Sequence, residues 1–368
     1  MTFSTDVMRL ARGGMGALPL YAPDLAMCAV DLSDNTNLWG APPAAVRTLR
    51  EAPVAALSRY PTLYSEPLRG ALLAYAGIAD VPEIGVMTGC GSDDVLDSTM
   101  RAFGASGDSI AFSAPTFSMI PVLARLNGLT PVPIPFLAGF DLDAERLVGA
   151  GAKITYLCTP NNPTATAASR GAVEYVVTHA RGIVLIDEAY AEFAPETFVD
   201  LVAQNERVVV VRTFSKAFGL AGLRVGYGIG ANRVVRLIER ARGPYKVNSI
   251  AERTVRAALE PLPDGLEWVR KHAAIAVANR IRLTAELRQR GLDLIALPSA
   301  ANFVMVPTAR AAEMFRAMSA RGVLVRAFTA MPQDLPVFAE SDGAALRIGV
   351  GPWDMMETML HVLREVIA

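Results

Sequence analysis

The chain holds only three cysteines and three histidines in 368 residues, and this scarcity limits the chemistry open to it. The cysteines are isolated and odd in number, so free thiols in a reducing compartment explain them better than a disulfide framework. The histidines lie singly in helical patterns without the spacing of metal ligands, so we expect no metal site. The cysteines are Cys28, Cys90 and Cys158, and the histidines are His179, His272 and His361.

Long apolar runs and an excess of one charge are also missing. No apolar run reaches the roughly 20 residues that cross a bilayer. The N-terminus lacks a basic stretch followed by an apolar core, so we expect no secretory signal. The formal net charge is −1 with Lys and Arg spread along the chain, which argues against nucleic acid as a partner. We therefore expect a cytoplasmic protein that binds small molecules and neither membranes nor nucleic acid.

What the chain does contain is an alternation of short apolar runs and helical patterns from about residue 83 to 230. This alternation predicts an α/β fold with a mostly parallel sheet. After about Tyr245 the pattern changes to a long helical region over 250–291, then to shorter strand-like runs and a closing helix from Trp353. We expect an N-terminal segment (1–44) that packs partly with the small domain, a large domain (45–245) and a small C-terminal domain (246–368).

Polar residues stand just after the expected strands, at 89–94, 159–164, 187–190 and 213–216. Ligands of parallel sheets bind beyond these carboxyl ends. A helix opening at Ser92 would offer free N–H groups to a phosphate. On its own, however, capping of that helix by Asp93 is the simpler explanation.

Two charged residues stand in apolar surroundings. Asp187 ends an apolar strand, where an unpaired carboxylate is costly. Two explanations of this position are equally good: Asp187 caps the following helix, or it pairs with a protonated heterocyclic nitrogen. Lys216 follows V-V-V-V-R-T-F-S. Burial would keep its amine neutral and nucleophilic, although a surface lysine with a buried stem explains it more simply on its own. Thr213, Ser215 and Arg224 suit a phosphate ester. Together these residues describe a pyridoxal 5'-phosphate site.

A family resemblance covers nearly the whole chain. The chain resembles fold-type I pyridoxal-phosphate enzymes of the class I/II aminotransferase family, and within it the histidinol-phosphate aminotransferases. The resemblance implies a large domain with a mostly parallel seven-stranded sheet flanked by helices, and a smaller α+β C-terminal domain. The matching segments come in the family order: R-Y-P (59–61), G-S-D-D, A-P-T-F-S-M (114–119), T-P-N-N-P-T (159–164), D-E-A-Y, T-F-S-K-A-F-G-L-A-G-L-R, P-Y-K-V-N-S (244–249), A-N-F and L-R-I-G-V-G.

The resemblance also implies roles at the matched positions. Lys216 would form the Schiff base and later move the substrate proton, with Asp187 on the pyridine nitrogen. Asn162 and Tyr190 would bind the ring hydroxyl, and Phe117 would stack on the ring. Backbone groups at Ser92 and Asp93, with Ser215 and Arg224, would hold the phosphate, and Thr213 belongs to the same cofactor site.

Other matches concern the partner subunit and the substrate. Tyr60 would reach the phosphate of a neighbouring subunit, which implies a homodimer with shared active sites. Arg347 would bind an anionic group of the substrate, with Asn37 nearby. Arg326 and Tyr21 match residues associated with a substrate phosphate, although Arg326 could equally serve in an ion pair.

Several positions depart from the family pattern, and they bear on the substrate rather than on the cofactor. Ala165 stands where glycine is usual, and Phe117 cannot make the hydrogen bond of a tyrosine. Thr36 replaces an acidic residue, bulky Trp39 stands beside the expected entrance, and Lys246 replaces a small polar residue. The 327–343 loop could reshape the pocket.

Three hypotheses follow from these observations. The first is an aminotransferase of amino-acid biosynthesis that acts on histidinol phosphate or a similar amine, with a 2-oxo acid such as 2-oxoglutarate as acceptor. The second is a relative with the same cofactor that acts on aromatic or other amino acids by transamination, decarboxylation or elimination. The third, a nucleotide-binding dehydrogenase or a non-catalytic module, lacks the Gly-rich dinucleotide fingerprint.

Overall fold

The structure is a computed structural model that describes residues 10–13, 15–18, 28–289 and 291–367. Tyr21 therefore lies outside the described residues. Within the described part, no helix combines the length and apolar character needed to cross a bilayer. No cluster of three or more His, Cys, Asp or Glu side chains in that part is arranged to hold a metal ion.

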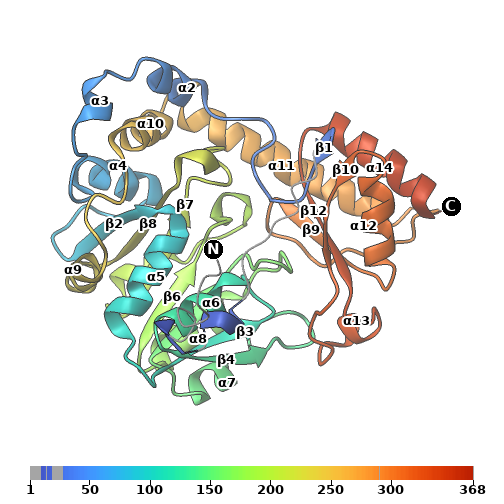
Figure 1. The fold of residues 1–368 in the computed structure, drawn as a ribbon, viewed down its shortest axis with the longest axis horizontal. Coiled ribbons are helices and arrows are strands. Elements are labelled where there is room, and N and C mark those ends of the chain that lie inside the picture. The colour runs from blue at the N-terminus through green and yellow to red at the C-terminus, as the bar shows by residue number, and fades with distance from the viewer. Residues whose placement is uncertain (1–9, 14, 19–27, 290, 368) are drawn as a thin grey trace, which may run out of the picture.

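A seven-stranded sheet forms the centre of the larger part of the molecule (Figure 1). Its order is β2-β8-β7-β6-β5-β3-β4, and β8 alone runs antiparallel to its neighbours. The predicted α/β fold with a mostly parallel sheet is confirmed. The strands are β2 (Ile84–Cys90), β3 (Ser109–Ala114), β4 (Thr130–Pro135), β5 (Ile154–Cys158), β6 (Ile183–Asp187), β7 (Val208–Thr213) and β8 (Val225–Ala231).

Helices cover both faces of this sheet, which explains why most residues of its central strands are apolar and buried. Successive strand residues point to opposite faces, so Leu185 belongs to the core cluster that includes residues of α5, α6 and α9, whereas Ile186 belongs to the cluster that includes residues of α4, α7, α8 and α10. The first group comprises α5 (Gly91–Phe103), α6 (Met119–Leu126) and α9 (Asn232–Ala241). The other helices of this part are α2 (Pro43–Arg50), α3 (Ala55–Ser58), α4 (Glu66–Ala76), α7 (Ala144–Gly149), α8 (Arg170–His179) and α10 (Ser249–Leu259), with the short turns η1 (Met15–Ala17), η2 (Ala191–Phe193), η3 (Val199–Ala203) and η4 (Ala221–Leu223).

A second core lies around a three-stranded antiparallel sheet with the order β11-β12-β9. The strand β1 (Val30–Asp31) pairs in parallel with β10 (Val323–Leu324), so this strand of the N-terminal segment joins the second part. The remaining elements are β9 (Phe303–Pro307), β11 (Arg326–Phe328), β12 (Ala345–Gly349), α12 (Ala311–Ser319), α13 (Pro336–Ala339) and α14 (Trp353–Ile367).

One helix connects the two cores. Helix α11 (Leu266–Leu287) runs from the larger part toward the smaller one (Figure 1). Its first half buries Leu266 and Val269 in the core of the large sheet, and its last turns bury Leu283 and Leu287 in the second core. A shift of α11 would therefore disturb both cores.

Two expected elements are divided in the structure. The helical region over 250–291 is two helices, because Pro261 and Pro263 lack the N–H that a continuous helix needs. The run G-V-L-V-R contributes β10 to one sheet and β11 to another, with Val325 between them. The second division brings Arg326 into the same small sheet as Arg347.

Candidate active site

Lys216 lies in the turn after β7 and is half-buried. Its Nζ donates a hydrogen bond to the backbone oxygen of Asp34 at 3.0 Å and lies 5.8 Å from the centre of the Tyr190 ring. Burial lowers the pKa of Lys216 to about 8, and the positive charge of Arg347 acts in the same direction. The amine is therefore much closer to its neutral, nucleophilic form than an exposed lysine would be.

Asp187 is the last residue of β6 and is only 3% exposed. One carboxylate oxygen accepts from the hydroxyl of Tyr156 at 2.8 Å, and the other accepts from the backbone N–H of Ala189 at 3.0 Å. Burial raises the pKa of Asp187 to about 6, partly offset by these hydrogen bonds. Among the described residues no arginine or lysine forms an ion pair with Asp187, so this carboxylate can take a cationic partner.

The beginning of α5 lies against the backbone of β8. A Cβ added at Gly226 would stand 2.2 Å from the Ser92 nitrogen and 2.4 Å from the Gly91 carbonyl carbon. Gly91 has φ +78°, a conformation that glycine adopts without strain, and its N–H donates to the Arg224 carbonyl at 3.0 Å. Only glycine at 226 allows this close approach, which presents the free N–H groups of the first helical turn.

Hydroxyl and charged side chains surround this helix start. The Arg224 guanidinium lies 3.4 Å from the Ser215 hydroxyl and 3.5 Å from the Asp93 carboxylate. Thr213 donates to the same Ser215 hydroxyl at 3.0 Å. The four predicted side chains thus meet where the helix dipole favours an anion. Burial raises the pKa of Asp93, although Arg224 and Lys216 oppose the shift.

Arg347 approaches the same region from β12 and is 8% exposed. Its guanidinium donates to Asn162 Oδ1 at 2.7 Å and to the Ser33 carbonyl at 2.5 Å. Arg326 is the direct partner of Arg347 in the antiparallel β11–β12 pair. Residues directly opposite each other carry their side chains on the same face, so two arginines share this face of the small sheet.

Of the remaining predicted residues, some lie beside Lys216 and Tyr60 does not. Tyr190 is buried, and its hydroxyl accepts a hydrogen bond from Asn35 Nδ2 at 3.2 Å. Asn37 binds the Ala217 carbonyl at 2.7 Å, beside Lys216. Phe117 packs at the edge of the α5/α6/α9 core. Tyr60 is not brought to this group: it is 83% exposed and stacks on Tyr245.

Three departures from the family pattern have local structural explanations. Trp39 packs against His272 of α11, with ring centres 6.2 Å apart. Lys246 forms a 2.8 Å ion pair with Asp94 in the first turn of α5. Ala165 has φ +67°, the left-handed region in which glycine costs least, which explains why glycine is usual at this position.

Some residues around the site were not predicted. Asn35 and Tyr156 contact Tyr190 and Asp187, but both belong to segments far away in sequence. Glu188 and Arg212 form a buried ion pair at 2.8 Å that ties together the ends of β6 and β7. Glu188 directly follows Asp187, and Arg212 directly precedes Thr213. These positions next to predicted site residues were the only sign in the sequence that the two charges could pair.

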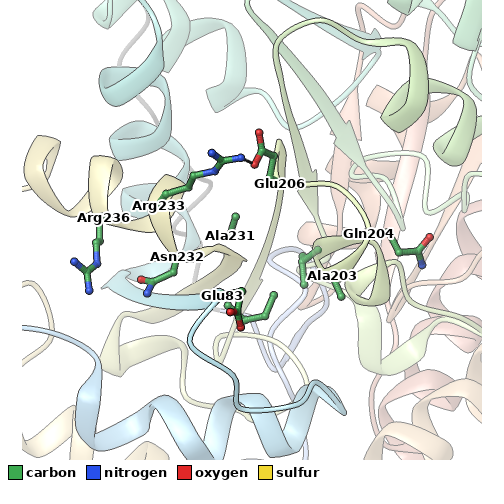
Figure 2. A pocket seen from close by; sticks show the side chains of 10 residues that line it. Glu83, Ala203, Gln204, Glu206, Ala231, Asn232, Arg233 and Arg236 are labelled. Carbon is green, nitrogen blue, oxygen red and sulfur yellow. Dashed lines mark ion pairs between the residues drawn. The ribbon is translucent and has the colours of Figure 1, made fainter.

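The strand ends opposite the site also form a hollow. This hollow has a volume of about 750 Å³. Figure 2 shows side chains that line it, among them Arg233, which forms an ion pair with Glu206. It lies at the start of β2 and the end of β8, whereas the predicted residues stand at the other ends of these strands. None of the predicted site residues lines it.

Comparison with known proteins identifies the relatives of the chain. The family pattern "Aminotransferase class I and II" matches residues 28–363. A histidinol-phosphate aminotransferase from Roseiflexus castenholzii is 37% identical over 351 residues, which cover 92% of this chain and 89% of the relative. An aromatic amino acid aminotransferase from Mycolicibacterium vanbaalenii is 34% identical over 330 residues, which cover 86% of this chain and 90% of the relative.

Solved structures agree with this likeness. The histidinol-phosphate aminotransferase from Sinorhizobium meliloti, in complex with pyridoxal-5'-phosphate, superposes with a TM-score of 0.79 at 25% identity. The alignment covers 92% of this chain and 91% of that structure. The histidinol-phosphate aminotransferase from Clostridium acetobutylicum has a TM-score of 0.81 at 20% identity, over 92% of this chain and 99% of its own, and supports the fold.

Proposed function

Because the chain belongs to the class I and II aminotransferase family and is a pyridoxal-phosphate-dependent aminotransferase, we propose that it takes the amino group of histidinol phosphate and gives it to a 2-oxo acid such as 2-oxoglutarate. The observation that carries this choice of donor is the pair Arg326 and Arg347, directly opposite each other on β11 and β12. A phosphate monoester carries close to two negative charges, and two guanidinium groups match that charge better than one.

The chemistry of the side chains fits the cofactor. The phosphate would be held at the start of α5 by the N–H groups around Ser92 and by Thr213, Ser215 and Arg224, with Asp93 beside them. The close approach of Gly226 to Ser92 supports this assignment, because it leaves room for backbone N–H groups to reach an anion. Asp187, a buried carboxylate without a cationic partner among the described residues, suits a protonated ring nitrogen.

Pyridoxal phosphate supplies an aldehyde and an electron-withdrawing ring when it is bound. The chain supplies the groups that orient this chemistry and move protons. In its neutral form Lys216 Nζ is a nucleophile and afterwards a base that can move the substrate proton. Asn162 and Tyr190 are proposed to bind the ring hydroxyl, Phe117 to pack against the ring, and Asn37 to lie beside the bound substrate. Arg347 would fix an anionic group of the substrate.

A second candidate donor is an aromatic amino acid. The ring centres of Phe303 and Phe328 lie 5.4 and 5.8 Å from the Arg347 guanidinium. Phe328 is only half-buried, so an aromatic side chain would find an apolar neighbour beside a carboxylate-binding arginine. In this case Arg347 would bind the α-carboxylate, and Arg326 would lie outside the substrate contacts.

A half-reaction distinguishes the two donors. The cofactor-loaded protein is mixed separately with histidinol phosphate, histidine, phenylalanine and glutamate, and the visible absorbance is followed as it converts to that of pyridoxamine phosphate. The proposal predicts that histidinol phosphate reacts at least tenfold more efficiently than histidine or phenylalanine. Arg326→Met should cost about tenfold or more in kcat/KM for histidinol phosphate and little for phenylalanine. Conversion by plain amino acids alone would reject histidinol phosphate as the donor.

We also propose a homodimer in which Tyr60 reaches the partner subunit's cofactor. An apolar surface supports this proposal. Around a hollow of about 700 Å³, lined by residues 56–61 and 248–250, Val54, Leu57 and Tyr60 are 78%, 72% and 83% exposed. Contiguous exposed apolar residues are typical of interfaces.

Two further assignments belong to the same proposal. The three parts 1–44, 45–245 and 246–368 are proposed as the domain organisation; within the third part, α10 packs in the core of the large sheet and α11 is shared between the two cores. The three unpaired cysteines support a reducing compartment, which we propose to be the cytoplasm.

A further inference from the structure

The segment over residues 33–35 is held by side chains that come from distant parts of the chain. Three successive backbone carbonyls each accept one hydrogen bond. The pairs are Ser33 with Arg347 at 2.5 Å, Asp34 with Lys216 at 3.0 Å and Asn35 with Asn302 at 3.0 Å. These hydrogen bonds hold the segment against Lys216 and against Arg347, the two residues proposed to bind the cofactor and the substrate.

Asn35 is the buried member of this segment, with 3% exposure. Its φ is +59°, a left-handed conformation that asparagine and aspartate tolerate better than most residues. Its side-chain amide nitrogen donates to the Tyr190 hydroxyl at 3.2 Å. An amide N–H can only donate, so the phenolic oxygen is the acceptor in this contact.

This contact decides what Tyr190 can do with its own hydrogen. A phenol has one O–H to donate, and burial raises the pKa of Tyr190, so the hydroxyl stays protonated. Because Asn35 occupies the oxygen as a donor, the Tyr190 hydrogen remains available to an acceptor on a ligand bound at Lys216. The phenolate-type oxygen of a pyridoxal ring is such an acceptor.

We propose that Asn35 is a positioning residue that makes Tyr190 a hydrogen-bond donor to the cofactor's ring oxygen, and that it thereby sets the proton affinity of the linkage at Lys216. This inference rests on the proposed roles of Tyr190 and Lys216. A ring oxygen that receives the Tyr190 hydrogen is less basic, so it holds the proton of the neighbouring linkage less firmly.

Other charged groups around the site also shift the pKa values of Lys216 and Tyr190. The groups that act on Lys216 are Arg347, Asp34, Asp93 and Arg224, and those that act on Tyr190 are Arg347, Cys158 and Asp187. Asn35→Ala leaves all of these groups in the chain and adds no charge, so it isolates the loss of one hydrogen-bond donor, whereas Asn35→Asp also adds a negative charge that raises the midpoint in the same direction.

Absorbance titrations of the cofactor-loaded protein without substrate test the inference. Asn35→Asp replaces the donor with an acceptor of the same shape that competes for the Tyr190 hydrogen. The midpoint of the visible absorbance change should move to higher pH by about one unit. Asn35→Ala removes the donor only and should give a smaller shift in the same direction. Thr36→Val, which removes a hydroxyl bonded to the Asp34 carboxylate, serves as the neighbouring control and should keep the wild-type midpoint.

Two results would overturn the inference. If Asn35→Asp keeps the wild-type midpoint, Tyr190 already donates to residue 35 or does not depend on it. If Asn35→Ala shifts the midpoint more than Asn35→Asp, the residue acts through its left-handed backbone, which alanine adopts less readily. Tyr190→Phe distinguishes failure of the inference about Asn35 from failure of the proposed role of Tyr190. A shift there with none in Asn35→Asp removes only the inference about Asn35. No shift in either variant also removes the proposed role of Tyr190.

Discussion

At the scale of single residues, the environment of Lys216 changes what an ordinary side chain can do. With a pKa of about 8, about one molecule in ten carries the neutral amine at pH 7. A free lysine at its usual pKa of 10.5 would be neutral in far fewer molecules. Burial is the larger cause and Arg347 the second one, so the same guanidinium that is proposed to bind substrate also activates the nucleophile.

The capture of the cofactor should follow this pKa. Because only the neutral amine attacks an aldehyde, the rate at which apoprotein takes up pyridoxal phosphate should rise about tenfold per pH unit below pH 8. It should level above that pH. Stopped-flow absorbance measures the rate. Arg347→Met removes a neighbouring positive charge, so its rate should level at higher pH. A wild-type rate that keeps rising to pH 10 would contradict the activated state of Lys216.

Sequence reasoning predicted the residues that are proposed to carry the chemistry, and it missed residues that contact them. Lys216 follows β7, Asp187 ends β6 and Arg224 directly precedes β8, and all three belong to segments with recognisable patterns. Asn35 and Tyr156 act by contacts across 155 and 31 positions. Such pairs depend on how the chain folds back on itself, and an isolated asparagine or tyrosine in a sequence carries no sign of its distant partner.

At the scale of elements, the proposed phosphate site depends on the contact between β8 and the start of α5. Gly226→Ala would force its Cβ against the Ser92 nitrogen, so the helix start must move. The dissociation constant for pyridoxal phosphate should rise at least tenfold, or about 1.4 kcal/mol. Titration of the apoprotein measures it, with circular dichroism as a check of folding.

The same substitution at a neighbouring glycine provides the control. Gly222 has no atom within 4 Å of an added Cβ, so Gly222→Ala should bind the cofactor like the wild type. A folded Gly226→Ala protein with wild-type affinity would show that the helix start does not hold the phosphate.

Local pattern predicted most elements, because each depends on residues within the element. The start of α5 at Gly91 and of α14 at Trp353 agree with expectation. The division of the 250–291 region was missed although Pro261 and Pro263 marked it. The division of G-V-L-V-R could not be read locally, since β10 and β11 are separated by their partners, β1 and β12.

At the scale of the whole molecule, the proposed dimer explains an apolar surface that a single chain leaves in water. Leu57→Glu should convert a dimer into a monomer at micromolar concentration, because the charge would be buried against the second copy. Size-exclusion chromatography with light scattering measures the mass. Ile295→Glu, at a position of 69% exposure in the other part of the molecule, should leave the dimer intact. A monomeric wild type would reject the shared active site.

The central claim is that Lys216 binds the cofactor covalently, and the sequence makes this claim easy to test. The chain has only four lysines, Lys153, Lys216, Lys246 and Lys271. The cofactor-loaded protein is reduced with borohydride and digested, and the modified peptide is identified by mass spectrometry. This claim predicts the pyridoxyl group on Lys216 and no such label in Lys216→Ala. A label mainly on another lysine, or full transamination by Lys216→Ala, would contradict it.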